Sequence, residues 1–174
     1  MNAKRLGSIA VVLLAVLMMV VVSRTEEIKQ SDGLTWIKYD DGLKLAAKSN
    51  KPIIVDFYTD WCGFCKRMDK LTYTDSTVAT YLKKHFILVK INGDSKDLLN
   101  LTSGSLTGRQ VTQSYGVTGY PTTWFLEPTG NKIDKLVGYV GPDKLIIVLK
   151  FIGDGAYKTQ TWEAYYAKAT GSSQ

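Results

Sequence analysis

The chain has 174 residues, of which 45% are hydrophobic and 22% charged, which suits one globular domain with an appendage. Its net charge of +6 is spread along the chain without a basic block, which argues against nucleic-acid binding. Two cysteines exclude a disulfide-rich framework, and with a single histidine, His85, they are hard to assemble into a four-ligand zinc site.

The N-terminal segment predicts a membrane anchor. Lys4 and Arg5 precede an uncharged apolar run at residues 6–22, and its 17 residues reach the lower end of the roughly 17–25 that a spanning helix needs. Basic residues before the run hold the N-terminus in the cytoplasm and send the rest across the membrane. The best cleavage site, Val21–Ser23, is poor. We therefore favour residues 1–23 as an uncleaved signal anchor over a cleaved signal peptide of a secreted protein. Either way, the remaining chain faces the periplasm or another extracytoplasmic space, where disulfides persist.

The remainder predicts a linker at residues 24–33, an α/β domain at 34–153 and a helical extension at 154–174. Apolar, β-rich runs predict strands at 36–39, 53–58, 86–91, 122–126 and 132–139, with the last two forming a hairpin. Helical spacing and capping residues predict helices at 40–49, from Cys62 onward, after Asp75, at 109–115, at 142–152 and around Trp162. This order predicts a mixed sheet with helices on both faces and an antiparallel edge.

Three segments carry more specific expectations. The first helix should be capped by Asp40 or Asp41 and turn apolar residues inward: Leu43, Ala46 and Ala47. Residues 92–108 are rich in Gly, Ser, Thr and Asn, and a connection of this length predicts a functional or flexible loop. His85 is expected at a helix end, without a catalytic role.

Cys62 and Cys65 form a Cys-x-x-Cys motif that follows a buried strand and opens a helix. Residues three apart on a helix are neighbours, so the pair can meet the roughly 4.4–6.8 Å Cα separation of a disulfide. The helix N-terminus stabilises a thiolate on Cys62, which makes Cys62 the attacking nucleophile. Cys65, one turn further in and more buried, is the resolving thiol. The alternatives are a static disulfide and half of a metal site, and the βαβ context favours the redox pair.

The stretch 55–66, which contains Trp61 directly before Cys62, resembles the thioredoxin superfamily, and the resemblance extends over residues 34–153. It implies a thioredoxin fold and a thiol–disulfide oxidoreductase with no metal and no cofactor other than the redox-active disulfide. The residues implied to be catalytic are Cys62, Cys65, Asp56, Lys90 and Pro121. The residues implied to bind substrate surround the pair: Trp61, Gly63, Phe64 and Tyr120.

The resemblance also assigns roles to residues outside the motif. Asp56 matches the buried aspartate that moves the proton of the buried cysteine, and Lys90 matches its lysine partner. Taken alone, Asp56 in an apolar strand is a core carboxylate satisfied by Lys90, but burial raises the pKa of such a group and lets it accept a proton. Residues 117–122 resemble the cis-proline loop, so Tyr120–Pro121 should be cis and face the cysteines. Gly138 resembles the glycine of the edge strand.

Within the superfamily, Lys51–Pro52, Asp60–Cys62 and residues 66–75 resemble the C-terminal domain of DsbD-type reductases and related exported thioredoxins. The chain departs from the family in three places. Phe64 replaces the proline of ordinary thioredoxin, residues 92–108 are longer than the usual connection, and the segment from Asp154 is an extension. The resemblance implies a reductase for disulfides of exported proteins, such as apocytochromes. Its electrons would come from a separate membrane carrier of the DsbD type.

Two other functions remain as alternatives. The first is a disulfide oxidant or isomerase of the same fold. Such proteins commonly place a histidine between the two cysteines, whereas Gly63 and Phe64 stand there in this chain, which favours the reductant. The second alternative is a metal-binding or chaperone module that uses Cys62, Cys65 and His85.

Overall fold

The computed structural model describes residues 28–29, 33–101 and 104–171. The predicted anchor at residues 1–23 and most of the predicted linker lie outside the described residues. Within the described ranges, no helix combines the length and the apolar character that crossing a membrane requires.

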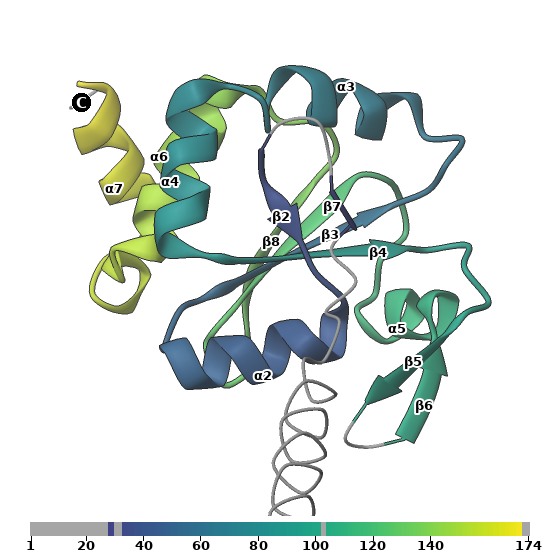
Figure 1. Cartoon of the computed structure of the whole chain (residues 1–174). Helices are drawn as coiled ribbons and strands as arrows, with labels where there is room; N and C mark the ends of the chain where they lie inside the picture. The colour runs from purple at the N-terminus through teal and green to yellow at the C-terminus, as the bar shows by residue number, and fades with distance from the viewer. Residues whose placement is uncertain (1–27, 30–32, 102–103, 172–174) are drawn as a thin grey trace, which may run out of the picture.

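The centre of the molecule is a four-stranded sheet in the order β4-β3-β7-β8 (Figure 1). Its strands are β3 (Ile53–Tyr58), β4 (Ile87–Asn92), β7 (Thr122–Leu126) and β8 (Lys132–Val137). β3 pairs in parallel with β4 and antiparallel with β7, and β8 is antiparallel to β7. The sheet is therefore mixed with an antiparallel edge, as the sequence predicts.

Helices cover both faces of this sheet (Figure 1). One face packs against α2 (Tyr39–Ser49) and α5 (Gly108–Ser114). The other packs against α3 (Gly63–Leu71), α4 (Ser76–His85) and α6 (Pro142–Gly153). Two hydrophobic cores result, one on each side of the sheet, which confirms the predicted layers.

The central strand β3 is buried on both faces, as a continuous apolar run requires. Side chains alternate along a strand, so Ile54 joins the core beneath α4 and α6, while Val55 and Phe57 join the core beneath α2 and α5. The same alternation places Asp56 on the face of Ile54, which is also the face that α3 covers.

Sequence signals locate several helix starts correctly. The Asp75 carboxylate accepts hydrogen bonds from the backbone N–H groups of Thr77 and Val78, each 3.0 Å long, and so caps α4. Pro142 occupies the first turn of α6, where its missing N–H has no intrahelical partner to lose. Cys62 is the N-cap of α3.

The expectations for residues 36–49 are partly wrong. The strand is β2 (Thr35–Trp36), which pairs with β1 (Ile28–Lys29), and Tyr39 already begins α2. Lys38 is the N-cap, so Asp40 and Asp41 do not cap the helix but lie in its first turn, where the helix dipole favours acidic groups.

The prediction for the inward face of α2 is right for Ala46, which is buried, and for Leu43, which packs against the core, and is wrong for Ala47. Ala47 is exposed, whereas Gly42 and Ala46 are buried. A Cβ at Gly42 would lie 2.4 Å from Val89 Cγ2, so the absent side chain lets α2 approach β4 closely. The buried face of α2 therefore contains Tyr39, Gly42 and Ala46.

Residues 92–108 do not form only a loop. They contain the hairpin β5 (Leu98–Leu101) and β6 (Gly104–Thr107), which leads directly into α5. Thr107 and Gln110 form a reciprocal capping box at the start of α5. Because this cap fixes the end of β6 next to the helix, the hairpin is tied to the domain at its C-terminal side.

A C-terminal helix, α7 (Trp162–Thr170), is present where aromatic spacing predicts one, after a short 3₁₀ turn, η2 (Ala156–Lys158). The rings of Trp162 and Tyr165 pack against Phe151 of α6, with ring centroids 5.5 and 5.1 Å apart. This extension therefore adds to the core on the α6 side of the sheet.

Candidate functional site

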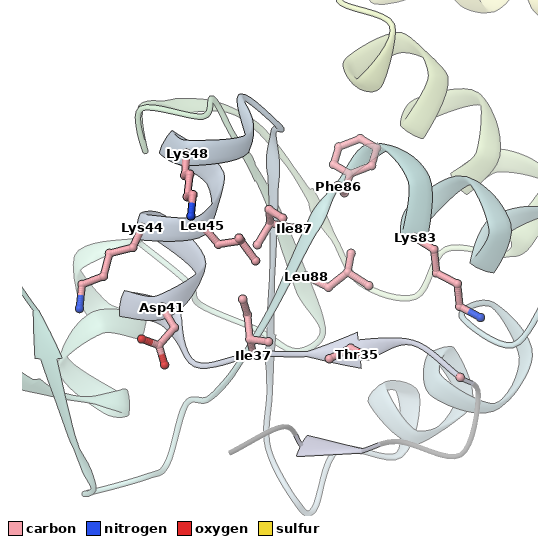
Figure 2. Close-up of a pocket in the computed structure, with 11 residues that line it drawn as sticks. Thr35, Ile37, Asp41, Lys44, Leu45, Lys48, Lys83, Phe86, Ile87 and Leu88 are labelled. Atoms are coloured by element: carbon pink, nitrogen blue, oxygen red, sulfur yellow. The ribbon is translucent and has the colours of Figure 1, made fainter. Parts of the chain in front are cut away.

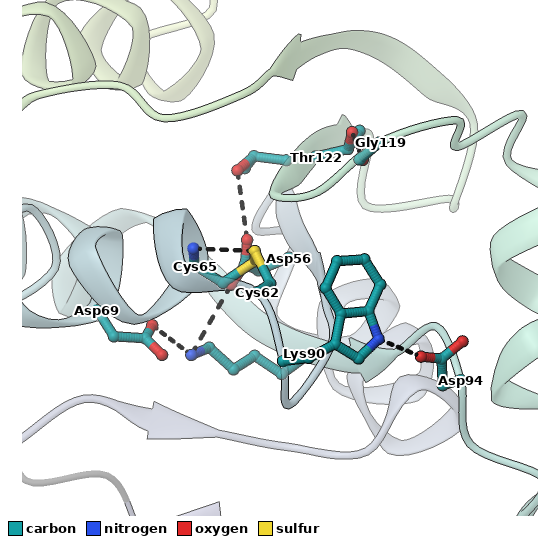
Figure 3. The surroundings of a disulfide bond; sticks show 10 residues. Asp56, Cys62, Cys65, Asp69, Lys90, Asp94, Gly119 and Thr122 are labelled. Atoms are coloured by element: carbon teal, nitrogen blue, oxygen red, sulfur yellow. Dashed lines mark hydrogen bonds and ion pairs between the residues drawn. A yellow bond between two sulfur atoms is a disulfide. The ribbon is translucent and has the colours of Figure 1, made fainter.

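Cys62 and Cys65 are joined in a disulfide at the start of α3, with their Cα atoms 5.3 Å apart (Figure 3). The backbone N–H of Cys65 donates a hydrogen bond of 3.0 Å to Cys62 Sγ. A free N–H in the first turn of a helix stabilises negative charge, so the same contact favours a Cys62 thiolate after reduction. The structure thus confirms the predicted position of Cys62 at the helix N-terminus, and its role as the nucleophile stays a prediction.

The two cysteines are equally buried, each with 4% of its surface exposed. The expectation that Cys65 is the more buried of the two is therefore wrong for the oxidised protein, because the N-cap residue is also covered by its neighbours. In contrast, Trp61 is 70% exposed and Phe64 is 60% exposed. Apolar surface is thus presented next to a disulfide that is itself recessed.

Asp56 and Lys90 are neighbours on β3 and β4 in the same register, and they form a buried ion pair. Lys90 Nζ lies 3.8 Å from Asp56 Oδ2, and 5% and 3% of the two side chains are exposed. Burial raises the pKa of Asp56 from 3.8 to about 6, although the Lys90 charge acts in the opposite direction. Asp56 therefore changes charge close to neutral pH, which suits a group that accepts and releases a proton.

Asp69 is a third member of this cluster that sequence reasoning missed. Its carboxylate accepts a hydrogen bond from Lys90 Nζ, so Lys90 is shared between Asp56 and Asp69 (Figure 3). The Asp69 side chain is 25% exposed and therefore reaches solvent. Its negative charge also contributes to the raised pKa of Asp56. The signal available in the sequence was its position four residues after Cys65, on the same face of α3.

Aromatic and hydroxyl groups enclose the charges. Lys90 Nζ lies 4.9 Å from the ring centre of Trp36, and Tyr58 and Tyr73 are also within cation–π range. The Thr123 hydroxyl donates a 3.5 Å hydrogen bond to Asp56 Oδ1. Burial raises the pKa of Tyr73 far above its usual value, so its hydroxyl stays protonated.

The peptide bond between Tyr120 and Pro121 is cis, as the resemblance implies. Gly138 lies just beyond β8 rather than within it, and has a φ of +85°. Its N–H donates a 2.8 Å hydrogen bond to the Pro121 carbonyl, so the glycine ties the proline loop to the sheet edge. The Thr122 hydroxyl closes the loop from the other side through the Gly119 carbonyl, at 2.8 Å.

The segment after β4 contacts two aromatic rings near the disulfide, the exposed Trp61 and the half-buried Tyr120. Trp61 Nε1 donates a 2.7 Å hydrogen bond to Asp94 Oδ2, and Arg109 Nη2 lies 3.6 Å from Asp94 Oδ1. A Cβ at Gly93 would lie 2.0 Å from the Tyr120 hydroxyl, so the glycine makes room for that ring. The rings of Trp61 and Tyr120 meet edge to face, 5.9 Å apart. Sequence reasoning missed Asp94 and Arg109, because no local pattern links them to Trp61.

His85 is the last residue of α4, and its ring stacks on Tyr81 with a centroid distance of 4.1 Å. Among the residues that the structure describes, no group of three or more His, Cys, Asp or Glu side chains is arranged to hold a metal ion. The geometry of the site therefore consists of a disulfide, a buried ion-pair cluster and a surrounding apolar surface.

Comparison with known proteins agrees with this geometry. Residues 39–153 match the family of thioredoxin-like domains. The thiol:disulfide interchange protein DsbD of Vibrio vulnificus is 33% identical over 100 residues, which are 56% of this chain and 15% of DsbD. The fold resembles that of a thioredoxin-fold protein from Helicobacter pylori, with a TM-score of 0.64 and 24% identity over 72% of this chain and 88% of that one. It also resembles a candidate disulphide-isomerase from Bacteroides thetaiotaomicron, with a TM-score of 0.56 and 31% identity over 71% of this chain and 95% of that one.

The chain spans about one sixth of the length of the DsbD proteins that it matches. The family match, in contrast, covers well over half of the chain and includes the disulfide, the ion-pair cluster and the cis-proline loop. The chain therefore belongs to the thioredoxin-like family, as a thiol–disulfide oxidoreductase in which Cys62 and Cys65 form a disulfide.

Proposed function

We propose that the protein is a reductant, which uses the Cys62–Cys65 dithiol to reduce disulfides of exported proteins. The observation that carries this direction is the pair of residues between the cysteines. Gly63 and Phe64 supply no positive charge to a Cys62 thiolate, and a less stabilised thiolate makes the dithiol a stronger reductant. The similarity to proteins named for thiol:disulfide interchange supports the same reaction class.

The proposed reaction transfers two electrons in two exchange steps. The Cys62 thiolate attacks one sulfur of a substrate disulfide, forms a mixed disulfide and releases the other sulfur as a thiolate. Asp56 accepts the proton of the Cys65 thiol, directly or through water, since its raised pKa of about 6 leaves it charged but basic at pH 7. The Cys65 thiolate then attacks Cys62 Sγ and releases the second substrate thiolate. The products are a reduced substrate and the Cys62–Cys65 disulfide.

Location and electron supply are part of the same proposal. Residues 1–23 anchor the chain in the cytoplasmic membrane and residues 34–153 face the periplasm, which is supported by the basic residues before the apolar run. The dithiol is regenerated by the reverse exchange with a dithiol of a membrane carrier of the DsbD type. A tether confines the domain near such a carrier and so raises the local concentration of each for the other.

The reduction potential of the Cys62–Cys65 pair tests this direction. The full-length protein in detergent is equilibrated with glutathione and dithiothreitol buffers, and the oxidised fraction is measured by thiol trapping and mass spectrometry. A reductant has a potential near or below about −270 mV. A potential of about −120 to −180 mV would make the protein a disulfide donor or isomerase instead. A pair that does not exchange would contradict both.

A further inference from the structure

A groove of about 610 Å³ lies between α2, β2 and the junction of α4 with β4 (Figure 2). Its floor is apolar and is formed by residues from four elements or their junctions: Ile37, Leu45, Phe86, Ile87 and Leu88. Leu45 is 44% exposed there, although it is a large aliphatic residue. The groove therefore leaves apolar surface accessible to a ligand or to another surface.

The rim of this groove is basic. Lys44 and Lys48 come from α2 and Lys83 comes from α4, and all three side chains are exposed (Figure 2). Asp41 is the one carboxylate among the residues that line the groove. An apolar floor with a positively charged rim complements a surface that combines acyl chains with anionic headgroups.

The groove and the disulfide lie at opposite ends of the parallel strand pair. Ile53 pairs with Ile87 at the start of β3 and β4, and Ile87 lines the groove. Tyr58 pairs with Asn92 at the other end of the same strands, and Cys62 follows Tyr58 after a three-residue turn. A surface that docks at the groove therefore leaves the redox pair uncovered.

The length of chain before the first described strand limits how far this side can be from a membrane. Five residues, 23–27, separate the apolar run from Ile28 of β1, and fully extended they span at most roughly 20 Å. β1 pairs with β2, and Thr35 of β2 lines the groove. An anchor at residues 6–22 would thus hold the groove side of the domain close to the bilayer.

We propose that this groove is a docking surface for an anionic lipid bilayer, with Lys44, Lys48 and Lys83 contacting headgroup phosphates. The inference rests on the anchor that forms part of the proposed function, and it adds an orientation to it. With the groove against the membrane, the disulfide faces the aqueous compartment. The substrate then has to present its disulfide, and the electron donor its dithiol, outside the bilayer to reach the Cys62–Cys65 pair.

Lysine footprinting of the full-length protein tests this orientation. The protein is reconstituted into vesicles of phosphatidylcholine alone or with phosphatidylglycerol added, and lysines are acylated briefly and quantified by mass spectrometry. Lys44, Lys48 and Lys83 should be acylated at least about fivefold more slowly in the anionic vesicles, which corresponds to roughly one lysine–membrane attraction each. High salt should remove this protection. Lys66 and Lys70 of α3 are exposed and do not line the groove, so they are internal controls and should react equally in both.

Several results would overturn the docking surface. Acylation of the three lysines at the same rate in both vesicle types would refute the phosphate contact. If that rate were also lower than the rate in detergent, the shielding would come from proximity to the bilayer alone. A mature protein that lacks residues 1–23 would also refute it. Turnover of a soluble disulfide in detergent is measured in parallel. Retained turnover together with a failed footprint would reject the docking surface and leave the redox function standing.

Discussion

The two ends of the parallel strand pair place lysine in opposite environments. At the disulfide end, Lys90 is buried with Asp56 and shared with Asp69. At the other end, Lys44 and Lys48 stand exposed around an apolar groove. Removing charges from water is costly, and an attraction between buried charges offsets that cost only with good partners. The buried charges therefore lie at the end of the strand pair where we propose that a proton moves, whereas the exposed charges lie where we propose that the domain meets the membrane.

Replacement of the cysteines should have the largest effect at the disulfide end. Cys62→Ser and Cys65→Ser should each lower turnover at least about 10³-fold, because the nucleophile or the resolving thiol is lost. Cys65→Ser should accumulate a stable mixed disulfide with an aromatic disulfide reagent, and Cys62→Ser should not. Intact mass measures the adduct. Faster adduct formation by Cys62→Ser would reverse the two assigned roles.

The contribution of the buried Asp56 to the stability of the fold should fall as the pH rises. Asp56 keeps its proton up to pH about 6 in the folded protein, whereas the unfolded chain releases it near 3.8. The folded state therefore binds more protons between these values, so the stability from this group is complete below pH 3.8 and is lost by about pH 6. The expected loss is about 3 kcal/mol.

Urea unfolding of the oxidised protein at several pH values measures this change as the difference between wild type and Asp56→Asn. The variant should gain relative stability as the pH rises from 4 to 7, because wild type loses the contribution of protonated Asp56 whereas asparagine does not titrate. Lys90 keeps Asp69 as a partner in the variant. Asp143→Asn, at an exposed site on α6, serves as the control and should show a flat difference. A flat difference for Asp56→Asn as well would show that Asp56 is ionised at acid pH and would remove the contrast between the two ends.

A positive charge placed beside Cys62 should raise the reduction potential of the Cys62–Cys65 pair. Phe64 is 60% exposed and Gly63 has open space around it, so Phe64→His should fold normally. Stabilising the thiolate tenfold should raise the reduction potential by about 30 mV, with a larger rise at pH 6 than at pH 8 because histidine is charged at the lower pH. Phe64→Gln is the neutral control. An equal rise in both variants would assign the effect to lost aromatic surface.

The smallest expected effect is at the segment after β4, which contacts Trp61 and Tyr120. Asp94→Asn breaks the ion pair with Arg109 and weakens the hydrogen bond from Trp61, at a cost of about 1 kcal/mol in stability. KM for a protein disulfide should rise about fivefold, while the rate with a small aromatic disulfide stays unchanged. Asp97→Asn is the matched control, since the Asp97 carboxylate accepts a hydrogen bond from the Ser95 hydroxyl in the same segment. Equal changes with both substrates would show a general loss of structure.

The sequence predicts those parts of the fold whose signals are local. The run 53–58, the Cys62–Cys65 motif and the Asp75 cap each depend on neighbouring residues, and the structure confirms the strand and the two helices that follow. The signal for the inward face of α2 is not local, because this face depends on the close approach of Gly42 to Val89 of β4. Ala47 was therefore placed on the wrong side of the helix.

The residues of the site also fall into those that the sequence predicts and those that it does not. The cysteine pair, Asp56, Lys90 and the cis bond before Pro121 were expected from the resemblance, and the structure brings Asp56 and Lys90 together. Their catalytic roles and the substrate-binding roles of the surrounding residues remain predictions. Asp69 and Asp94 were missed because each acts through a partner more than 20 positions away in sequence. Composition alone also concealed the β5–β6 hairpin, whose residues are typical of loops.

The position of Lys90 against Trp36 gives the protein an internal optical reporter. Trp36 is fully buried, and the ammonium group lies 4.9 Å from its ring, so the emission of this indole responds to charge changes in the cluster. Trp61 is 70% exposed and directly precedes Cys62, so it emits from a watery environment beside the disulfide. The chain also contains Trp124 and Trp162, so changes in emission with pH and with reduction, measured as differences, should report on Trp36 and Trp61 without an added label.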